Sequence, residues 1–370
     1  MPFVILRLFV LLSAVGFLSS CVRAPQLVGI DNPEIPVASV VEATKRKIFM
    51  VTTREASEAA GVFYSDGRAP GIGFSSVTVS IPPTHVIGEL ERPTRLPPDP
   101  KTEFAIVDPV IFDTDKVFIS RINRELAKLA PKDRNILFFV HGYNNTVSDS
   151  LLRIAQFSED TEFRGVPVLF SWASAARAGR YVYDLNSALI ARPRILETAA
   201  VLRRTNARGL SLFAHSMGAF LTMEAMVQAQ LSGQYKQNVG LLDNVMLAAP
   251  DIDLDLFKTQ LALLPRENRN IFVFISRDDK ALGFVRLLSG GVVRAGAASE
   301  DDLAGLGVTI IDLSKVDDSF SGTHSKFAGS PEVVQLIGNS LKQDNYNKPS
   351  RAATLVDVLD GVPVLRVLTP

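Results

Sequence analysis

Short, fully apolar runs recur along the chain from Asn135 onward, and helix-length amphipathic segments separate most of them. The runs cover Ile136 to Val140, Val166 to Phe170, Leu210 to Ala214, Val245 to Ala249, Ile271 to Ile275 and Val308 to Ile311. Strands without polar alternation are typical of a parallel sheet that is covered on both faces. The pattern therefore predicts an α/β fold in which helices pack on both sides of a mostly parallel sheet.

Before this repeat the sequence predicts strands of another kind. Ile48 to Thr53 is a short apolar run, and Val77 to Ile81 alternates between apolar and polar residues until Pro82 and Pro83 interrupt it. We expect antiparallel strands in this N-terminal part. The proline-rich stretch from Glu91 to Pro100 is predicted to be a surface connection.

Residues 1–20 have the pattern of a secretion signal. An apolar stretch from Leu8 to Leu18 follows Arg7 and is too short for an ordinary membrane-spanning helix. It ends in Leu18-Ser19-Ser20-Cys21, which resembles the bacterial lipobox, where the signal is removed before a cysteine that then carries a lipid. Cys21 is the only cysteine of the chain, so it has no disulfide partner within it. The sequence thus predicts lipidation of Cys21; the alternatives are a conventional signal peptide with a chance cysteine, or an uncleaved anchor.

The segment 21–45 is interpreted as a tether between this anchor and a folded domain. It contains Pro25, Pro33 and Pro36, which suit an extended spacer. No later segment is long and apolar enough to span a membrane. Val22 carries no aspartate retention cue, so we expect a lipid-anchored protein on the periplasmic face of the cell envelope, at the outer membrane where the cell has two membranes.

Composition narrows the choice of partners. The chain has 370 residues, of which 47% are hydrophobic, so it can bury a large core. Lys and Arg total 39, and Asp and Glu also total 39, which leaves no net charge to attract nucleic acid. We therefore expect no nucleic-acid partner.

A motif of chemical interest follows the strand run that ends at Ala214. Ala214-His215-Ser216-Met217-Gly218 is the nucleophile-elbow pattern G-x-S-x-G with alanine at its first position, and the helix-prone segment Ala219 to Gln230 comes next. Small residues two before and two after the serine permit a sharp turn from strand to helix, which exposes the hydroxyl above the sheet. Ser216 is therefore the candidate nucleophile; the alternative is a strand-to-helix turn that contains a serine by chance.

A serine nucleophile needs a histidine base. In enzymes with a nucleophile elbow the order along the chain is serine, then an acidic residue, then histidine. The chain holds only His85, His141, His215 and His324, and His324 alone follows Ser216. It lies in a loop of small residues after the last apolar run. His324 is the candidate base, with a solvated loop histidine as the alternative.

The acid is expected in the loop after the run from Ile271 to Ile275. Asp279 is the first candidate and Asp278 the second, since one of them could instead cap the helix that follows. Asp251 and Asp253, which come after the preceding strand run, are further candidates.

Two backbone N–H groups are predicted to face a developing oxyanion. Met217 follows the nucleophile in the first turn of a helix, whose dipole adds to the stabilisation. Tyr143 lies in His141-Gly142-Tyr143-Asn144, directly after the run from Ile136 to Val140. In enzymes with a nucleophile elbow, a loop after an earlier strand supplies the second backbone N–H for the oxyanion. Gly142 would let the backbone approach a substrate closely. His141 and His215 are expected to pack beside these loops.

Residues 46 to 340 resemble a family of bacterial α/β-hydrolases that are described mostly as esterase-like or lipase-like and are often lipoproteins. The resemblance rests on the N-terminal strand pair and on Phe139-Val140-His141-Gly142-Tyr143-Asn144-Asn145, Leu169-Phe170-Ser171-Trp172, Tyr183-Asp184, Ala214-His215-Ser216-Met217-Gly218, Leu247-Ala248-Ala249-Pro250-Asp251-Ile252-Asp253 and Asp279-Lys280-Ala281-Leu282. It implies an α/β-hydrolase domain over 46–345, a serine nucleophile and hydrolysis of carboxylic esters. Residues 346–370 are left as a C-terminal tail, in which Pro349 to Pro370 match nothing in the family.

Together these features predict a serine hydrolase of the cell envelope that cleaves small-molecule or lipid esters with Ser216, His324 and Asp279. Neither a metal nor a cofactor is expected, because the histidines are scattered and the sequence has no phosphate-binding glycine loop. Two alternatives stay open. One is an acyltransferase that uses the same triad, and the other is a noncatalytic envelope lipoprotein that uses the fold as a binding module.

Overall fold

The computed structural model describes residues 24–238, 242–266, 270–316, 323–342 and 366–368. They form a ten-stranded sheet with the strand order β10-β9-β8-β7-β6-β4-β5-β1-β2-β3. The strands are β1 (Thr44–Ala56), β2 (Tyr64–Ile81), β3 (Ala105–Phe112), β4 (Asn135–Val140), β5 (Val166–Ser171), β6 (Gly209–His215), β7 (Leu242–Ala248), β8 (Ile271–Ile275), β9 (Thr309–Asp312) and β10 (Arg366–Leu368). Neighbouring strands from β9 to β1 in this order are parallel, whereas β2, β3 and β10 join antiparallel at the two edges.

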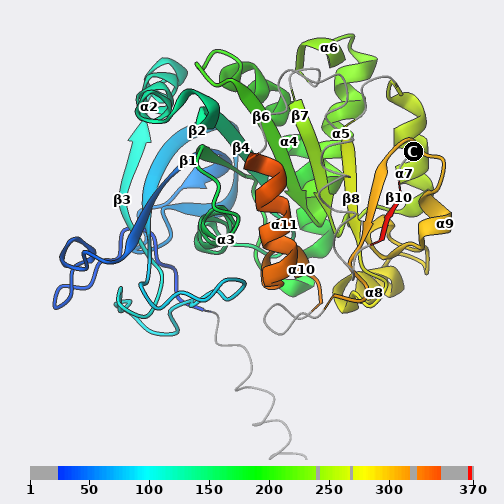
Figure 1. Ribbon diagram of the computed structural model, residues 1–370. Coiled ribbons are helices and arrows are strands. Elements are labelled where there is room, and N and C mark those ends of the chain that lie inside the picture. Colours follow the sequence, from blue (N-terminus) through cyan, green and yellow to red (C-terminus); the bar gives the residue numbers. More distant parts are fainter. Residues whose placement is uncertain (1–23, 239–241, 267–269, 317–322, 343–365, 369–370) are drawn as a thin grey trace, which may run out of the picture.

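Helices cover both faces of the sheet (Figure 1). One face carries α3 (Val147–Asp160), α10 (Lys326–Gly329) and α11 (Pro331–Lys342), and the other carries α2 (Asp115–Lys128), α4 (Tyr181–Leu202), α5 (Met217–Leu231) and α7 (Leu254–Leu263). The shorter elements are α6 (Tyr235–Asn238), α8 (Lys280–Leu288), α9 (Glu300–Leu303), η1 (Val37–Ser39), η2 (Pro131–Asp133), η3 (Ala178–Arg180) and η4 (Ala295–Ala297).

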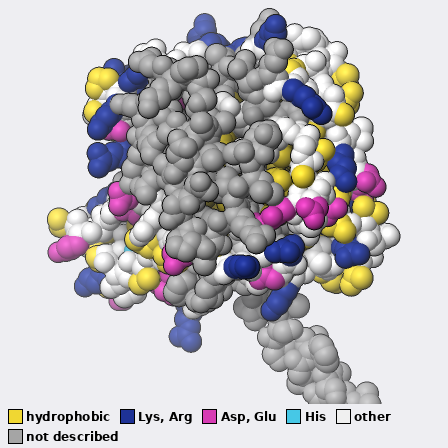
Figure 2. Space-filling model, turned by 45° about the vertical axis from the view of Figure 1, so that its right-hand side comes forward, with side chains coloured by type: hydrophobic (Ala, Val, Ile, Leu, Met, Phe, Trp, Pro, Cys, Tyr) yellow, Lys and Arg dark blue, Asp and Glu magenta, His cyan; other side chains and the backbone are white. Residues whose placement is uncertain are grey.

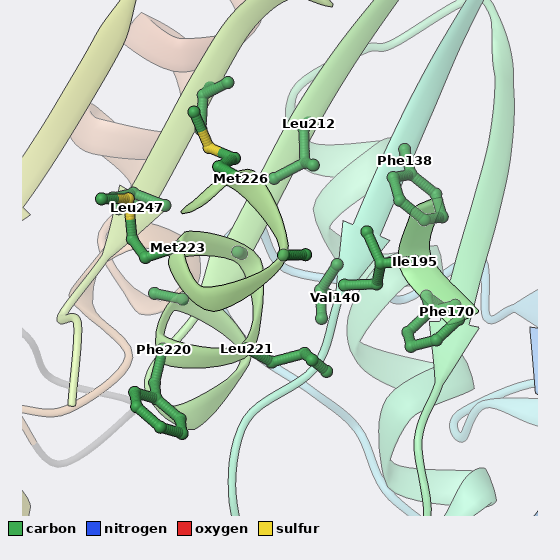
Figure 3. Packing of buried hydrophobic residues seen from close by; sticks show 14 of the residues in the cluster. Phe138, Val140, Phe170, Ile195, Leu212, Phe220, Leu221, Met223, Met226 and Leu247 are labelled. Atoms are coloured by element: carbon green, nitrogen blue, oxygen red, sulfur yellow. The ribbon is translucent and has the colours of Figure 1, made fainter. Parts of the chain in front are cut away.

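The two helical layers explain why the parallel strands are apolar at every position. Along β4, Phe138 and Val140 join the core under α4 and α5, while Leu137 and Phe139 join the core under α3. Both sets are buried, so a polar residue at either would lose its contact with water. Figure 3 shows the first of these cores, in which the apolar side chains of α5 lie among those of β4, β6 and β7.

The predicted fold class is confirmed, because every apolar run from Ile136 onward forms a strand of the mostly parallel sheet. The N-terminal strands β2 and β3 are antiparallel, as expected. The run from Ile48 to Thr53 lies in β1, which connects the two parts because it is antiparallel to β2 and parallel to β5. The stretch from Glu91 to Pro100 contains no helix or strand.

The tether prediction for 21–45 is wrong for its described part, residues 24–45, which pack on the domain. Leu27 is fully buried, and its backbone N–H donates to Ser148 Oγ over 2.9 Å. Val28 is also buried and forms isolated bridges with Gly61 and Ile106. Burial of these apolar side chains outweighs the extended preference of the prolines, which the sequence interpretation relied on.

The predicted signal peptide at 1–20, the predicted lipidation site Cys21 and most of the tail at 346–370 lie outside the described residues. The part of the tail that is described forms β10 and extends the sheet beside β9. In the described ranges no helix combines the length and the apolar character needed to cross a membrane. On the face seen in Figure 2, the described surface carries interspersed positive and negative side chains.

An ion cluster fixes the loop after β2 to the end of α3. The ring nitrogens of His85 lie 2.7 Å from Glu91 Oε2 and 2.7 Å from Asp160 Oδ1. Asp160 is buried and also accepts from the N–H of Gly88. Burial by itself would lower the pKa of His85, but the hydrogen bonds and charges of Asp160 and Glu91 outweigh it and raise that pKa to about 9.

We predict that this cluster stabilises the fold less as the pH rises. The pKa of His85 is higher in the folded chain than in the unfolded one, so its contribution is complete below about pH 6.5 and is lost as the pH rises through 9. His85→Gln should lower the free energy of unfolding by about 1.5–3 kcal/mol at pH 6 and by much less at pH 9.5. Urea denaturation of both proteins at the two pH values measures the difference; an unchanged difference would contradict the prediction.

Candidate active site

The turn from β6 to α5 holds Ser216 in a backbone conformation that is rare for residues with a side chain. Its φ is 54° and its ψ is −122°, a region that costs on the order of 1–3 kcal/mol. The Ser216 N–H donates to Ala248 O over 2.9 Å, and its carbonyl accepts from the N–H of Asp251 over 3.2 Å. The end of β7 and the loop after it therefore support the strained turn.

Gly218 explains the small residue on the helical side of this turn. A Cβ at position 218 would lie 2.4 Å from His141 O and 2.6 Å from Val140 O, which no side chain tolerates. The sequence suggested a close approach within the turn itself. In the structure the start of α5 also lies close to the backbone at the end of β4, which is a second reason for glycine at position 218.

Ser216, His324 and Asp279 form one hydrogen-bonded chain. Ser216 Oγ lies 3.1 Å from His324 Nε2, and Asp279 Oδ2 lies 2.7 Å from His324 Nδ1. Ser216 and Asp279 are buried, while the imidazole is partly exposed. The loops that follow β6, β8 and β9 bring these side chains together at the carboxyl edge of the sheet, where ligands bind in open α/β sheets.

The carboxylate of Asp279 has two functions in the fold. While Oδ2 faces the imidazole, Oδ1 accepts from the N–H of Leu282 over 3.0 Å and caps α8. Sequence reasoning treated capping and contact with the histidine as tasks for different members of the pair. The structure gives both tasks to one side chain.

The remaining acidic candidates face other partners. Lys326 Nζ donates to both carboxylate oxygens of Asp278 over 2.9 Å. Burial acts to raise the pKa of Asp278, but the hydrogen bonds from Lys326 and Ser276 outweigh it and lower that pKa. Asp253 caps α7 by accepting from backbone N–H groups of its first turn.

Asp251 lies close to the turn at Ser216, but its carboxylate forms an ion pair with Arg294. Its Oδ1 lies 2.7 Å from Arg294 Nε, and its Oδ2 accepts from the Tyr181 hydroxyl over 2.9 Å. Asp251 and Arg294 are both buried, so each needs the other to offset the loss of water. This pair fastens the segment after α8 to the loop after β7.

The loop after β4 lies directly against the nucleophile. A Cβ at Gly142 would lie 3.0 Å from Ser216 Cβ and 2.9 Å from His215 Nδ1, so the position favours glycine. Tyr143 follows, and its ring packs edge-on against Tyr181 at 5.3 Å between centroids. Among the residues that the structure describes, neither the Tyr143 N–H nor the Met217 N–H has a hydrogen-bond partner. Both predicted donors are thus available to a ligand.

His141 and His215 pack beside these loops. The His141 ring stacks on Trp172 with 5.0 Å between centroids, and burial, with a smaller effect of the Arg54 charge, lowers its pKa to about 3. The His215 ring contacts Phe327, and burial lowers its pKa well below the ordinary value. Burial thus disfavours the charged form of both imidazoles.

Sequence reasoning missed two buried charged residues that hold the loop after β4 in place. The carboxylate of Asp184 accepts from Ser174 Oγ over 2.5 Å and from the N–H of Asn144 over 3.3 Å. Arg54 donates to Asn145 O over 2.8 Å and to Ser174 O over 2.9 Å. The two side chains join the loop after β4 to the loop after β5.

The sequence contains some signal for Asp184 and none for Arg54. Tyr183-Asp184 was among the stretches that resemble the family, although nothing in the pattern assigned it a task. Arg54 stands at the end of an apolar run, where no local pattern distinguishes a buried cation from an exposed one. Within the described ranges, no three His, Cys, Asp or Glu side chains are grouped as a metal site requires.

A family model covers more than half of the chain and the whole candidate site. Residues 117–340 match the family described as "Alpha/beta hydrolase of unknown function (DUF900)". The matched range includes Ser216, Asp279 and His324 as well as both candidate oxyanion donors. No curated protein matches the sequence.

Several solved structures are similar in fold at low identity. A predicted CIB-like hydrolase from Thermoplasma acidophilum is 14% identical, with 58% of this chain and 89% of that chain covered and a TM-score of 0.34. Esterase Est22 is 13% identical, with 84% and 82% covered and a TM-score of 0.36. The carboxylesterase EstE1 from a metagenomic library is 10% identical, with 85% and 93% covered and a TM-score of 0.33. At such scores these likenesses bear on no detail of the site.

Proposed function

The chain belongs to the family of α/β-hydrolases of unknown function, and on that premise we propose that it is a serine hydrolase that cleaves carboxylic esters. The observation that carries the proposal is the hydrogen-bonded chain from Ser216 Oγ through the His324 imidazole to the Asp279 carboxylate. A nucleophile, a base and a group that orients the base are the parts that acyl transfer requires.

In the proposed first step, His324 Nε2 takes the proton of Ser216 Oγ as the oxygen attacks the ester carbonyl. The N–H groups of Tyr143 and Met217 stabilise the oxyanion of the tetrahedral intermediate. When the intermediate collapses, the alcohol leaves with the proton from His324, and the acyl group stays on Ser216.

In the second step, His324 removes a proton from water, and the resulting hydroxide attacks the acyl group. The carboxylic acid leaves, and the proton returns to Ser216 Oγ. Throughout, Asp279 holds the imidazole in the orientation that directs Nε2 to the serine and stabilises the imidazolium. The cap that Asp279 provides to α8 restricts its own rotation, which favours this task.

One test of the proposed function removes the candidate nucleophile. Ser216→Ala should lower the rate of hydrolysis of short aryl esters by at least about 10³-fold, because no other group can form the acyl intermediate. A fluorophosphonate probe should label the parent protein at Ser216 and leave the variant unlabelled. Ser232→Ala, at the other end of α5, is the matched control and should behave as the parent.

Each alternative to a hydrolase has its own outcome in this experiment. If the parent protein is not labelled and turns over no ester, the chain is a binding module. If labelling occurs but the acyl group passes to an added alcohol in preference to water, it is a transferase. Equal hydrolysis by Ser216→Ala and the parent would refute the assignment of the nucleophile.

Another test separates the two neighbouring acids, Asp279 and Asp278. Asp279→Asn should lower kcat by about 10³–10⁴-fold, because the amide no longer favours the required tautomer of His324. Its stability should change little, since asparagine also caps helices well. Asp278→Asn should cause a far smaller fall in kcat and a loss of stability, because it leaves the buried Lys326 without its carboxylate. The reverse order of kcat values would make Asp278 the acid.

We also propose that the protein is lipid-anchored through Cys21 in the cell envelope. The lipobox pattern Leu18-Ser19-Ser20-Cys21 and the absence of any other cysteine in the sequence support this. Growth with an alkyne-tagged fatty acid should label the parent protein but not Cys21→Ser, and the variant should leave the membrane fraction. Labelling that survives in the variant would rule the anchor out.

A further inference from the structure

Large apolar side chains of α8 stand in solvent beside the candidate active site. Phe284, Leu287 and Leu288 are 60%, 78% and 59% exposed, and Val292 in the following segment is 36% exposed. We call these four residues the α8 patch. The opposite side of the helix, which carries Leu282 and Val285, is buried in the domain. The helix is therefore apolar on an outer face that no described part of the chain covers.

The α8 patch lies at the same edge of the sheet as the nucleophile. The helix leaves the carboxyl end of β8, and its first N–H groups contact the triad region: Asp279 caps the helix, and the N–H of Lys280 donates to Thr323 Oγ1 over 3.2 Å. Thr323 is the neighbour of His324 in the chain. The helix that carries the α8 patch therefore begins at the candidate triad.

The charged side chains of α8 and of the segment that follows it, up to Ser299, are all positive. From Lys280 to Ser299 the sequence contains no Asp or Glu, and Lys280 and Arg286 are exposed on the helix. Exposed Phe and Leu bordered by Lys and Arg are typical of helices that lie in a lipid interface. The apolar side chains enter the acyl region while the cations contact headgroup phosphates.

The N-terminal segment enters the domain at this same edge. Leu27 donates to Ser148 Oγ in the first turn of α3, and α3 starts just beyond the carboxyl end of β4. In Figure 1, α8 lies on the lower side of the molecule, where the first described residues also lie. Cys21 precedes Leu27 by six residues, so a lipid on it would be held within about 20 Å of Leu27.

We propose that the α8 patch docks on a bilayer that contains anionic lipids, and that the active site thereby faces the membrane. The proposal extends the proposed esterase function, because it makes lipids or esters dissolved in the bilayer the substrate class. The short link between Cys21 and Leu27 agrees with this proposal. If Cys21 carries a lipid, a short link keeps this edge of the domain close to the bilayer.

The test uses the mature chain, residues 21–370, with Cys21→Ser so that no lipid contributes to binding. We expect it to co-sediment with vesicles of phosphatidylcholine and phosphatidylglycerol, and less with phosphatidylcholine alone. Phe284→Gln with Leu287→Gln should weaken binding by about tenfold or more, since two apolar side chains no longer enter the bilayer. Ile190→Gln with Leu231→Gln is the matched control, because these side chains are also exposed but lie on α4 and α5 away from α8; it should bind as the parent does.

Hydrolysis of a short soluble ester should be the same in the parent and in the α8 variant, which separates docking from catalysis. Failure of the parent to bind vesicles would overturn the proposal even if it hydrolyses esters. Equal loss of binding in the control would do so as well. A concentration-dependent dimer that the α8 variant abolishes would place a second copy of the chain on this face instead of lipid.

Discussion

Contacts between the ends of neighbouring strands hold Ser216, the candidate nucleophile, in a turn that its own backbone disfavours. The N–H of Ser216 donates to the last residue of β7, and its C=O accepts from the loop after that strand. The loop after β4 brings Gly142 against the Ser216 side chain. A strained residue persists only when its surroundings fix it from several sides. Because β4, β6 and β7 are adjacent in the sheet, the register of these strands determines where the hydroxyl lies.

The parts of this arrangement that the sequence predicts are those with a local cause. Parallel strands covered on both faces must be apolar throughout, and a turn as tight as that at Ser216 requires small neighbours, so both leave a pattern in the chain. His324 could be selected because only one histidine follows the serine. The packing of 24–45 could not be predicted from its prolines, because Leu27 and Val28 are buried by residues far away in the chain.

Buried charges around the site left the weakest signals, because their partners come from distant elements. Arg54 on β1 and Asp184 on α4 meet at Ser174, and Asp251 meets Arg294 and Tyr181. Isolated, each of these charges would be costly in the interior. Together they form a polar frame at the carboxyl edge of an otherwise apolar sheet. Such a frame keeps loops rigid, and rigid loops hold backbone donors in fixed positions.

Asp279 both caps α8 and holds the His324 imidazole, so the folding of that surface helix is coupled to the orientation of the imidazole. The carboxylate that orients the imidazole also closes the first turn of α8, so fraying of that turn frees the same side chain to rotate away from His324. Thermodynamic reciprocity follows: anything that stabilises the helical form of α8 raises the population of the aligned imidazole, and alignment of the imidazole stabilises the helix in return. One hydrogen bond at the N-terminus of α8, with a free energy of about 1 kcal/mol, thereby links the helix–coil equilibrium to the orientation of the His324 imidazole.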